Sequence, residues 1–137
     1  MDRFDADEAE YRNVMLMILF ILILAAEVFL SHQDGHKSGD ESRKIASVLR
    51  LPDRFIRVGA HILFFALLMF TGLLALPGYK RIVIIAVLLW TVMDEATKPM
   101  LHNFRHFSLQ DVGWNLLGAA IGSGLWYLIG ISDMIIE

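Results

Sequence analysis

The sequence contains no cysteine among its 137 residues. Without cysteine the chain has no disulfide bond, no thiolate nucleophile and no metal site built from thiolates. It also carries little charge, because Asp, Glu, Lys and Arg together make up 20% of the residues and the formal net charge is −3. So small a net charge gives no sign of a polyanionic partner, and we expect no nucleic-acid binding. Internal repeats and low-complexity tracts are also absent, so we expect a single domain over residues 1–137.

Apolar residues are abundant instead. They make up 56% of the chain, the mean hydropathy is +0.55, and they are gathered into long runs. This composition is typical of an integral membrane protein. We predict an all-α polytopic membrane protein with four antiparallel transmembrane helices, which cover about residues 14–31, 58–76, 80–98 and 111–131. The first run is too long for a signal peptide and follows an acidic, frayed segment, residues 1–13, so we predict a retained helix.

The third predicted span carries ionisable residues. Its apolar stretch, residues 82–93, is only about 18 Å long as a helix, whereas a bilayer core is about 30 Å thick. The helix must therefore continue to about Lys98, where we expect Pro99 to end it. Asp94, Glu95 and Lys98 then share one face of the helix, about one turn below the membrane surface. Ionisable side chains at membrane depth are costly, so their presence predicts a functional site.

The first long connection, residues 31–57, is polar but contains a short apolar stripe of Ile45, Val48 and Leu49. This pattern predicts a short helix that lies in the membrane interface and is stopped by Pro52. A solvated helix packed on the bundle explains the pattern equally well.

Three short patterns predict how the helices connect and pack. The tripeptide Pro77-Gly78-Tyr79 indicates a tight turn, so the second and third helices run antiparallel. Ser108 and Asp111 have the spacing of a helix cap and indicate the start of the fourth helix. In that helix Gly118 and Gly122 are one turn apart, which predicts close packing against another helix.

The antiparallel order determines where the polar side chains gather. The end of the first helix, the start of the second, the end of the third and the start of the fourth lie on one side, together with both polar loops, residues 31–57 and 99–110. The polar residues at these four ends are Glu27, Ser31, His61, Asp94, Glu95, Lys98, Asp111 and Asn115. We therefore predict one polar site at one face of the membrane.

Catalysis is one reading of this site. His61, Asp94, Glu95 and Asp111 are the candidate catalytic residues of a membrane-embedded hydrolase or transferase that uses general acid–base chemistry. Metal-dependent hydrolysis would use His61, Asp94 and Glu95, with His102 or His106 and Asp111 as further candidate ligands. The helical His-x-x-x-His and Glu-x-x-His pairs of common metal sites are absent, so we predict no metal ligand and no cofactor.

Ligand binding without catalysis is a second reading. Lys98, Arg105 and the N-terminus of the fourth helix, near Asn115, suit an anionic headgroup. A structural network that only holds the helices together is the third reading, with Arg105 and Asp111 as an ion pair.

The polar residues lie in stretches that have a characteristic order and spacing. The stretches are F-L-S-H-Q-D-G-H-K-S-G-D-E-S, R-V-G-A-H-I-L-F-F, D-E-A-T-K, Arg105 and D-V-G-W-N-L-L-G-A-A-I-G. In this order, from about residue 29 to residue 122, the chain resembles the VanZ-like family of small integral membrane proteins. Lys98 occupies a position where that family usually has glutamine. The first stretch adds Ser31, Gln33 and Ser38 to the candidate ligand-binding residues.

The resemblance implies a role in the cell envelope, with teicoplanin resistance as the phenotype that named the family. We therefore predict a polar pocket that binds or processes an envelope lipid or a lipid-linked precursor. Eight of the twelve Lys and Arg residues lie on the side of the site, and the positive-inside rule would place that side in the cytoplasm. The resemblance implies the reverse orientation, and we follow the resemblance. We predict a protein of the bacterial inner or plasma membrane with its termini in the cytoplasm and its site facing outward.

Overall fold

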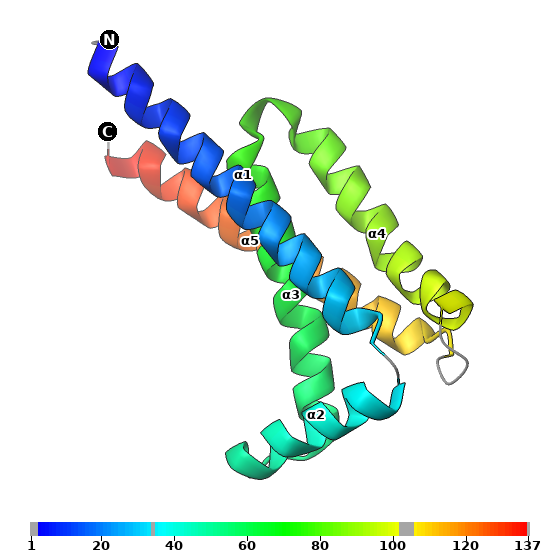
Figure 1. The fold of residues 1–137 in the computed structure, drawn as a ribbon. Helices are drawn as coiled ribbons and strands as arrows, with labels where there is room; N and C mark the ends of the chain where they lie inside the picture. The colour runs from blue at the N-terminus through cyan, green and yellow to red at the C-terminus, as the bar shows by residue number, and fades with distance from the viewer. Residues whose placement is uncertain (1–2, 34, 102–105, 137) are drawn as a thin grey trace.

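The computed structural model describes residues 3–33, 35–101 and 106–136, and the side chains of residues 10–33, 36–101 and 106–130. The described chain is all-α, as predicted (Figure 1). Its elements are α1 (Arg3–Ser31), α2 (Gly35–Leu49), α3 (Asp53–Ala75), the short 3₁₀ helix η1 (Pro77–Tyr79), α4 (Lys80–Leu101) and α5 (Leu109–Ile136). The η1 turn confirms the tight connection that the Pro-Gly-Tyr sequence predicted.

Helix α3 is the centre of the fold. It packs against α1, α2, α4 and α5, whereas the backbones of α1 and α4 approach each other at few positions. Figure 1 shows that α1, α3, α4 and α5 alternate in direction, and that α2 lies across the end of the molecule where α3 begins. The antiparallel order is therefore as predicted. The helices gather around α3, however, and do not form a regular four-helix ring.

The contact between α3 and α5 depends on two glycines. Gly118 lies against the backbone of Ile62 and Gly122 against the backbone of Ala66, so close that neither position has room for a β-carbon. In lipid, small residues favour helix association because they let the two backbones approach. The close helix packing that the spacing of these two glycines predicted is therefore confirmed.

A cluster of buried apolar side chains lies beside this contact. Its members are Phe65, Leu68, Met69, Leu73, Val83, Val87 and Ala119. Those on α3 recur at the three- and four-residue spacing of one helix face. Other large apolar side chains stay on the surface, as shown by the exposed fractions of Met15 (70%), Leu89 (62%) and Leu128 (60%). An apolar surface of this extent is unfavourable in water and suits a lipid environment.

Three of the described helices are long and apolar enough to cross a membrane. They are Glu10–Ser31, Asp53–Ala75 and Leu109–Gly130. Helix α4 has 22 residues, but it begins with Lys80 and Arg81 and carries three further charged residues in its last two turns. Length and composition therefore support three of the four predicted spans. Helix α4 differs from these three because it carries more charged residues.

The start of α3 differs from the prediction. The helix begins at Asp53 rather than near Val58, and Pro52 stands at its N-cap position. Proline is well suited to a helix start because its φ is fixed and its missing N–H needs no partner there. The preceding helix α2 ends at Leu49, before Pro52, and is followed by Arg50 with a φ of 54°.

The ends of two other helices also differ. Helix α4 runs through Pro99 to Leu101, so the prediction that Pro99 ends the helix is wrong. The proline lies within the last turn, where little helix follows it. At the other end of the chain, α1 begins at Arg3, so the described part of the polar lead is helical rather than frayed.

Candidate functional site

A cavity of about 380 Å³ is lined by residues from all five α-helices. The contributing segments are the end of α1, the inner part of α2, the first half of α3, the end of α4 and the start of α5. Of the polar residues predicted at the four helix ends, five line it: Glu27, Ser31, His61, Lys98 and Asp111. The helix ends therefore converge as the antiparallel order predicted, and the cavity is the candidate site.

The most deeply buried charges of the site belong to α4. Lys98 Nζ lies 3.1 Å from Asp94 Oδ2 and also pairs with Glu95 Oε1. The exposed fractions of Lys98, Asp94 and Glu95 are 2%, 0% and 1%. Their i, i+3 and i, i+4 spacing places all three on one face of the helix. The ammonium group is therefore already held by two carboxylates.

Hydrogen bonds join the end of α1 to the same part of α4. Ser31 Oγ donates to Asp94 Oδ1 at 2.5 Å, and His32 Nε2 lies 2.8 Å from Thr97 Oγ1. The other ring nitrogen of His32 lies 3.0 Å from the carbonyl oxygen of Val28, one turn earlier in α1. Asp94 thus connects α1 to the buried lysine of its own helix.

His61 enters the site from α3. Its Nδ1 lies 2.8 Å from Asn115 Oδ1 on α5, and its Nε2 lies 3.9 Å from Asp111 Oδ2. Because an amide oxygen only accepts, this contact places a proton on Nδ1 and, in the neutral ring, leaves the lone pair on Nε2. The orientation of the Asn115 amide is consistent with its second contact, from Nδ2 to the carbonyl oxygen of Thr91 at 3.5 Å. Asn115 is therefore a positioning residue for the imidazole.

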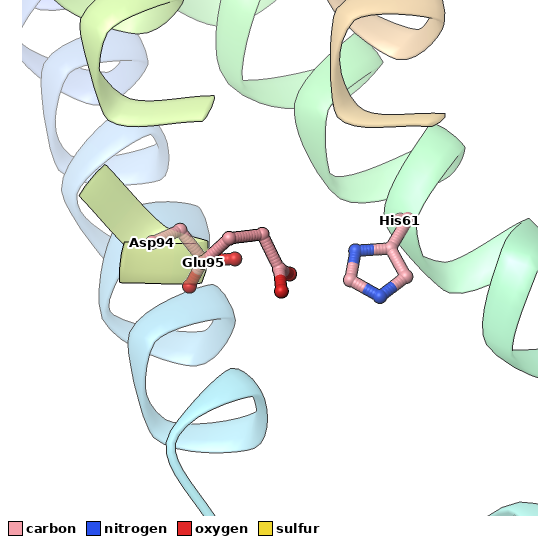
Figure 2. Close-up of side chains that lie close together, drawn as sticks. All are labelled: His61, Asp94 and Glu95. Carbon is pink, nitrogen blue, oxygen red and sulfur yellow. The ribbon is translucent and has the colours of Figure 1, made fainter. Parts of the chain in front are cut away.

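Figure 2 shows Asp94 and Glu95 extending from α4 toward the ring of His61 on α3. One nitrogen or oxygen atom from each of the three side chains lies within 4.8 Å of the other two. An imidazole and two carboxylates that converge in this way are suited to binding a cation. The structure thus brings His61 of α3 next to two neighbouring carboxylates of α4.

Glu27 adds a third buried carboxyl group, from α1. Its exposed fraction is 4%, and its Oε2 accepts a hydrogen bond from Trp90 Nε1 at 2.9 Å. Its charged neighbours are Asp94 and Lys98. The described part of the site therefore contains three buried carboxyl groups and one buried ammonium.

The profile of the VanZ/LLP1 family matches residues 14–130. The chain belongs to the VanZ/LLP1 family. No curated protein and no solved structure matches the chain. The resemblance seen in the sequence is thus confirmed, and the apolar helices identify this member of the VanZ/LLP1 family as a membrane protein.

Not every predicted site residue lines the cavity of this VanZ/LLP1 protein. Ser38 lines the cavity. Asn115 does not, but it is completely buried and contacts His61, which does. Gln33 is buried, with an exposed fraction of 9%, but is not part of the cavity lining. Arg105 and His102, which were predicted as a ligand-binding residue and a candidate metal ligand, lie outside the described residues.

Sequence reasoning missed several residues that line the cavity. They are Glu41, Ser42, Arg54, Arg57, Gln110 and Trp114, among others. Arg57 follows Arg54 by three positions, and His61 follows Arg57 by four. All three therefore share one face of α3. Placing the start of this helix at Val58 concealed that relation, because both arginines were then assigned to a loop.

Proposed function

We propose that the cavity of this VanZ/LLP1 protein binds the phosphate-bearing headgroup of a membrane lipid or of a lipid-linked envelope precursor. The observation that carries the proposal is the presence of Arg54 and Arg57 in the cavity lining, at the exposed start of α3. The planar guanidinium group suits phosphate because it donates two parallel hydrogen bonds. Two arginines one turn apart on one helix face can bind a phosphate together.

Both arginines are available to a ligand. Among the described residues Arg54 has no ion-pair partner. Arg57 pairs with Asp53 at 3.4 Å, but both side chains are about half exposed, and such surface pairs contribute little. Lys98, by contrast, is held by two buried carboxylates. The proposal therefore assigns the phosphate to Arg54 and Arg57 in place of Lys98.

The size and setting of the cavity also favour a lipid headgroup. Its volume of about 380 Å³ falls within the range of about 300–1,000 Å³ that is usual for small-molecule sites. Its lining mixes polar groups with apolar side chains such as Ile45, Ile56 and Phe64. Acyl chains would continue along the exposed apolar surface of the neighbouring helices.

In this proposal α4 is a fourth transmembrane helix. Its 22 residues are about 33 Å long, enough for a bilayer core of about 30 Å. Asp94, Glu95 and Lys98 do not oppose this placement, because they are buried in protein and not exposed to lipid. The termini then lie in the cytoplasm, the cavity faces outward, and α2 lies in the interface with Val48, which is 81% exposed, toward the lipid.

A lipid titration tests the proposal. The purified chain in a maltoside detergent, which contains no phosphate, is titrated with dihexanoyl phosphatidylglycerol while its melting temperature is followed. We expect a saturable rise for the parent protein and no rise for Arg54→Ala/Arg57→Ala. The matched control, Arg43→Ala/Lys44→Ala, removes two exposed charges of α2 and should respond like the parent.

Two outcomes of the titration would count against the proposal. If the lipid has no saturable effect on the parent protein, the polar network is structural. If the Arg54→Ala/Arg57→Ala protein responds like the parent, the phosphate does not bind at these arginines. Growth in teicoplanin of cells that express the parent or this variant tests the resistance phenotype that the resemblance implies.

A second candidate function is hydrolysis or group transfer on the same class of lipid. The observation that favours it is the orientation of His61, whose ring is held by Asn115 beside the carboxylates of α4. A neutral imidazole in this setting can act as a general base. Turnover of an envelope lipid that is lost in a folded His61→Ala protein would establish an enzyme, whereas binding without turnover would support the pocket alone.

A further inference from the structure

We propose that His61, Asp94 and Glu95 form a binding site for one divalent transition-metal ion, such as Zn²⁺ or Mn²⁺. Their ligand atoms lie within 4.8 Å of one another, on two packed helices, and the side chains extend toward one another in Figure 2. One imidazole nitrogen with two carboxylates is a donor set that suits these ions better than Mg²⁺. This site goes beyond headgroup binding and departs from the sequence-based expectation of no metal ligand.

The geometry requires only a small adjustment. Ligand atoms of a tetrahedral Zn²⁺ site lie about 2.0–2.2 Å from the ion and hence about 3.4 Å from one another. The largest separation here is 4.8 Å, so the side chains must close on the ion. The glutamate side chain has enough torsional freedom to do so while the backbones of α3 and α4 stay in place.

The ring of His61 is held in place by a hydrogen bond, as the rings of metal-binding histidines commonly are. Metal-binding histidines commonly donate their second ring N–H to an oxygen acceptor, which fixes the tautomer and the direction of the ring. Here Asn115 Oδ1 provides that acceptor at 2.8 Å. The neutral ring keeps a lone pair on Nε2, which lies 3.9 Å from Asp111 Oδ2.

The charges around the cluster also favour a cation. Asp94 Oδ2 is buried and accepts no hydrogen bond from the described residues, and its described partner is the ammonium of Lys98 at 3.1 Å. A divalent ion would supply the positive charge that one lysine does not provide.

Lys98 gives the proposal a distinctive signature. Its ammonium pairs with the same two carboxylates that would bind the ion, so lysine and metal compete. Removing the ammonium should therefore strengthen metal binding. A cluster that serves only to hold the lysine in place predicts no such gain.

The test is calorimetric titration of the full-length, tag-free and metal-stripped chain in detergent with Zn²⁺ and, separately, Mn²⁺. We expect one ion per chain for the parent protein, and binding at least about tenfold tighter for Lys98→Met because a neighbouring positive charge is gone. His61→Ala should lose the binding, and Asn115→Ala should weaken it by about 10–100-fold through loss of the ring's orientation. His106→Ala, which removes an exposed histidine, is the matched control and should bind like the parent.

The titration contains no lipid, so its result is independent of headgroup binding. Absence of stoichiometric binding by the parent protein would overturn the metal site, whatever the folding of the variants. Binding that survives in both His61→Ala and His61→Gln would overturn it as well, and so would an unchanged affinity in a folded Lys98→Met protein. Absorption of bound Co²⁺ provides a second readout, because its spectrum reports the ligands directly.

Discussion

Lys98→Met is the substitution that probes the buried ion network most sharply. The lysine is 2% exposed and pairs with Asp94 and Glu95, which are 0% and 1% exposed. Methionine preserves most of the side-chain volume but leaves two carboxylates without their shared partner. Removing one member of a buried ion pair typically costs about 3–5 kcal/mol. For a chain of this size such a loss lowers the melting temperature by roughly 10 °C or more.

The assay is thermal unfolding by circular dichroism in mild detergent and metal-free buffer. Lys44→Met is the matched control: Lys44 is exposed on α2, and surface substitutions usually change stability by less than about 0.5 kcal/mol. The double variant Lys98→Met/Glu95→Gln should recover part of the loss, since it removes one stranded carboxylate. If Lys98→Met melted at the parent temperature, the lysine would be extending to solvent and the buried network would be wrong.

Two further predictions concern packing and topology. Gly118→Ala should destabilise the protein by about 1–3 kcal/mol, because a β-carbon there meets the backbone of α3, whereas Gly124→Ala, with open space around it, should be tolerated; equal melting temperatures would contradict the close approach. Single cysteines are specific labels in a chain without native cysteine, so cysteines at Ser47 and His106 should react with an impermeant reagent outside intact cells and one at Tyr79 should not. Reaction at Tyr79 alone would reverse the orientation, and reaction of Ser47 and His106 from opposite sides would refute a fourth span.

Local periodicity predicted much of the fold. Apolar runs of helical length located α1, α3 and α5, and the Pro-Gly-Tyr turn fixed the antiparallel order of α3 and α4. The cap at Ser108 is also confirmed, because Ser108 Oγ accepts a hydrogen bond from the backbone N–H of Asp111 at 3.2 Å. The central place of α3 could not be predicted in this way, since it depends on which apolar faces pack together in three dimensions.

In the site, too, local spacing predicted some features, whereas contacts between distant residues could not be predicted. Lys98, Asp94 and Glu95 were placed on one face because their spacing is that of one helix. The hydrogen bonds from Trp90 to Glu27 and from Ser31 to Asp94 join residues 63 positions apart, and no local pattern encodes such contacts. The two arginines of the cavity were missed for a different reason, because the charged start of α3 was taken for a loop.

The central claim is that the cavity holds a lipid headgroup at Arg54 and Arg57, and native mass spectrometry of the protein released from mild detergent measures this directly. The parent protein should retain one phosphate-containing lipid per chain, and the Arg43→Ala/Lys44→Ala control should retain the same lipid. The Arg54→Ala/Arg57→Ala protein should be released without it while melting close to the parent temperature. A parent protein that carries no lipid, or an arginine variant that carries as much as the parent, would contradict the claim.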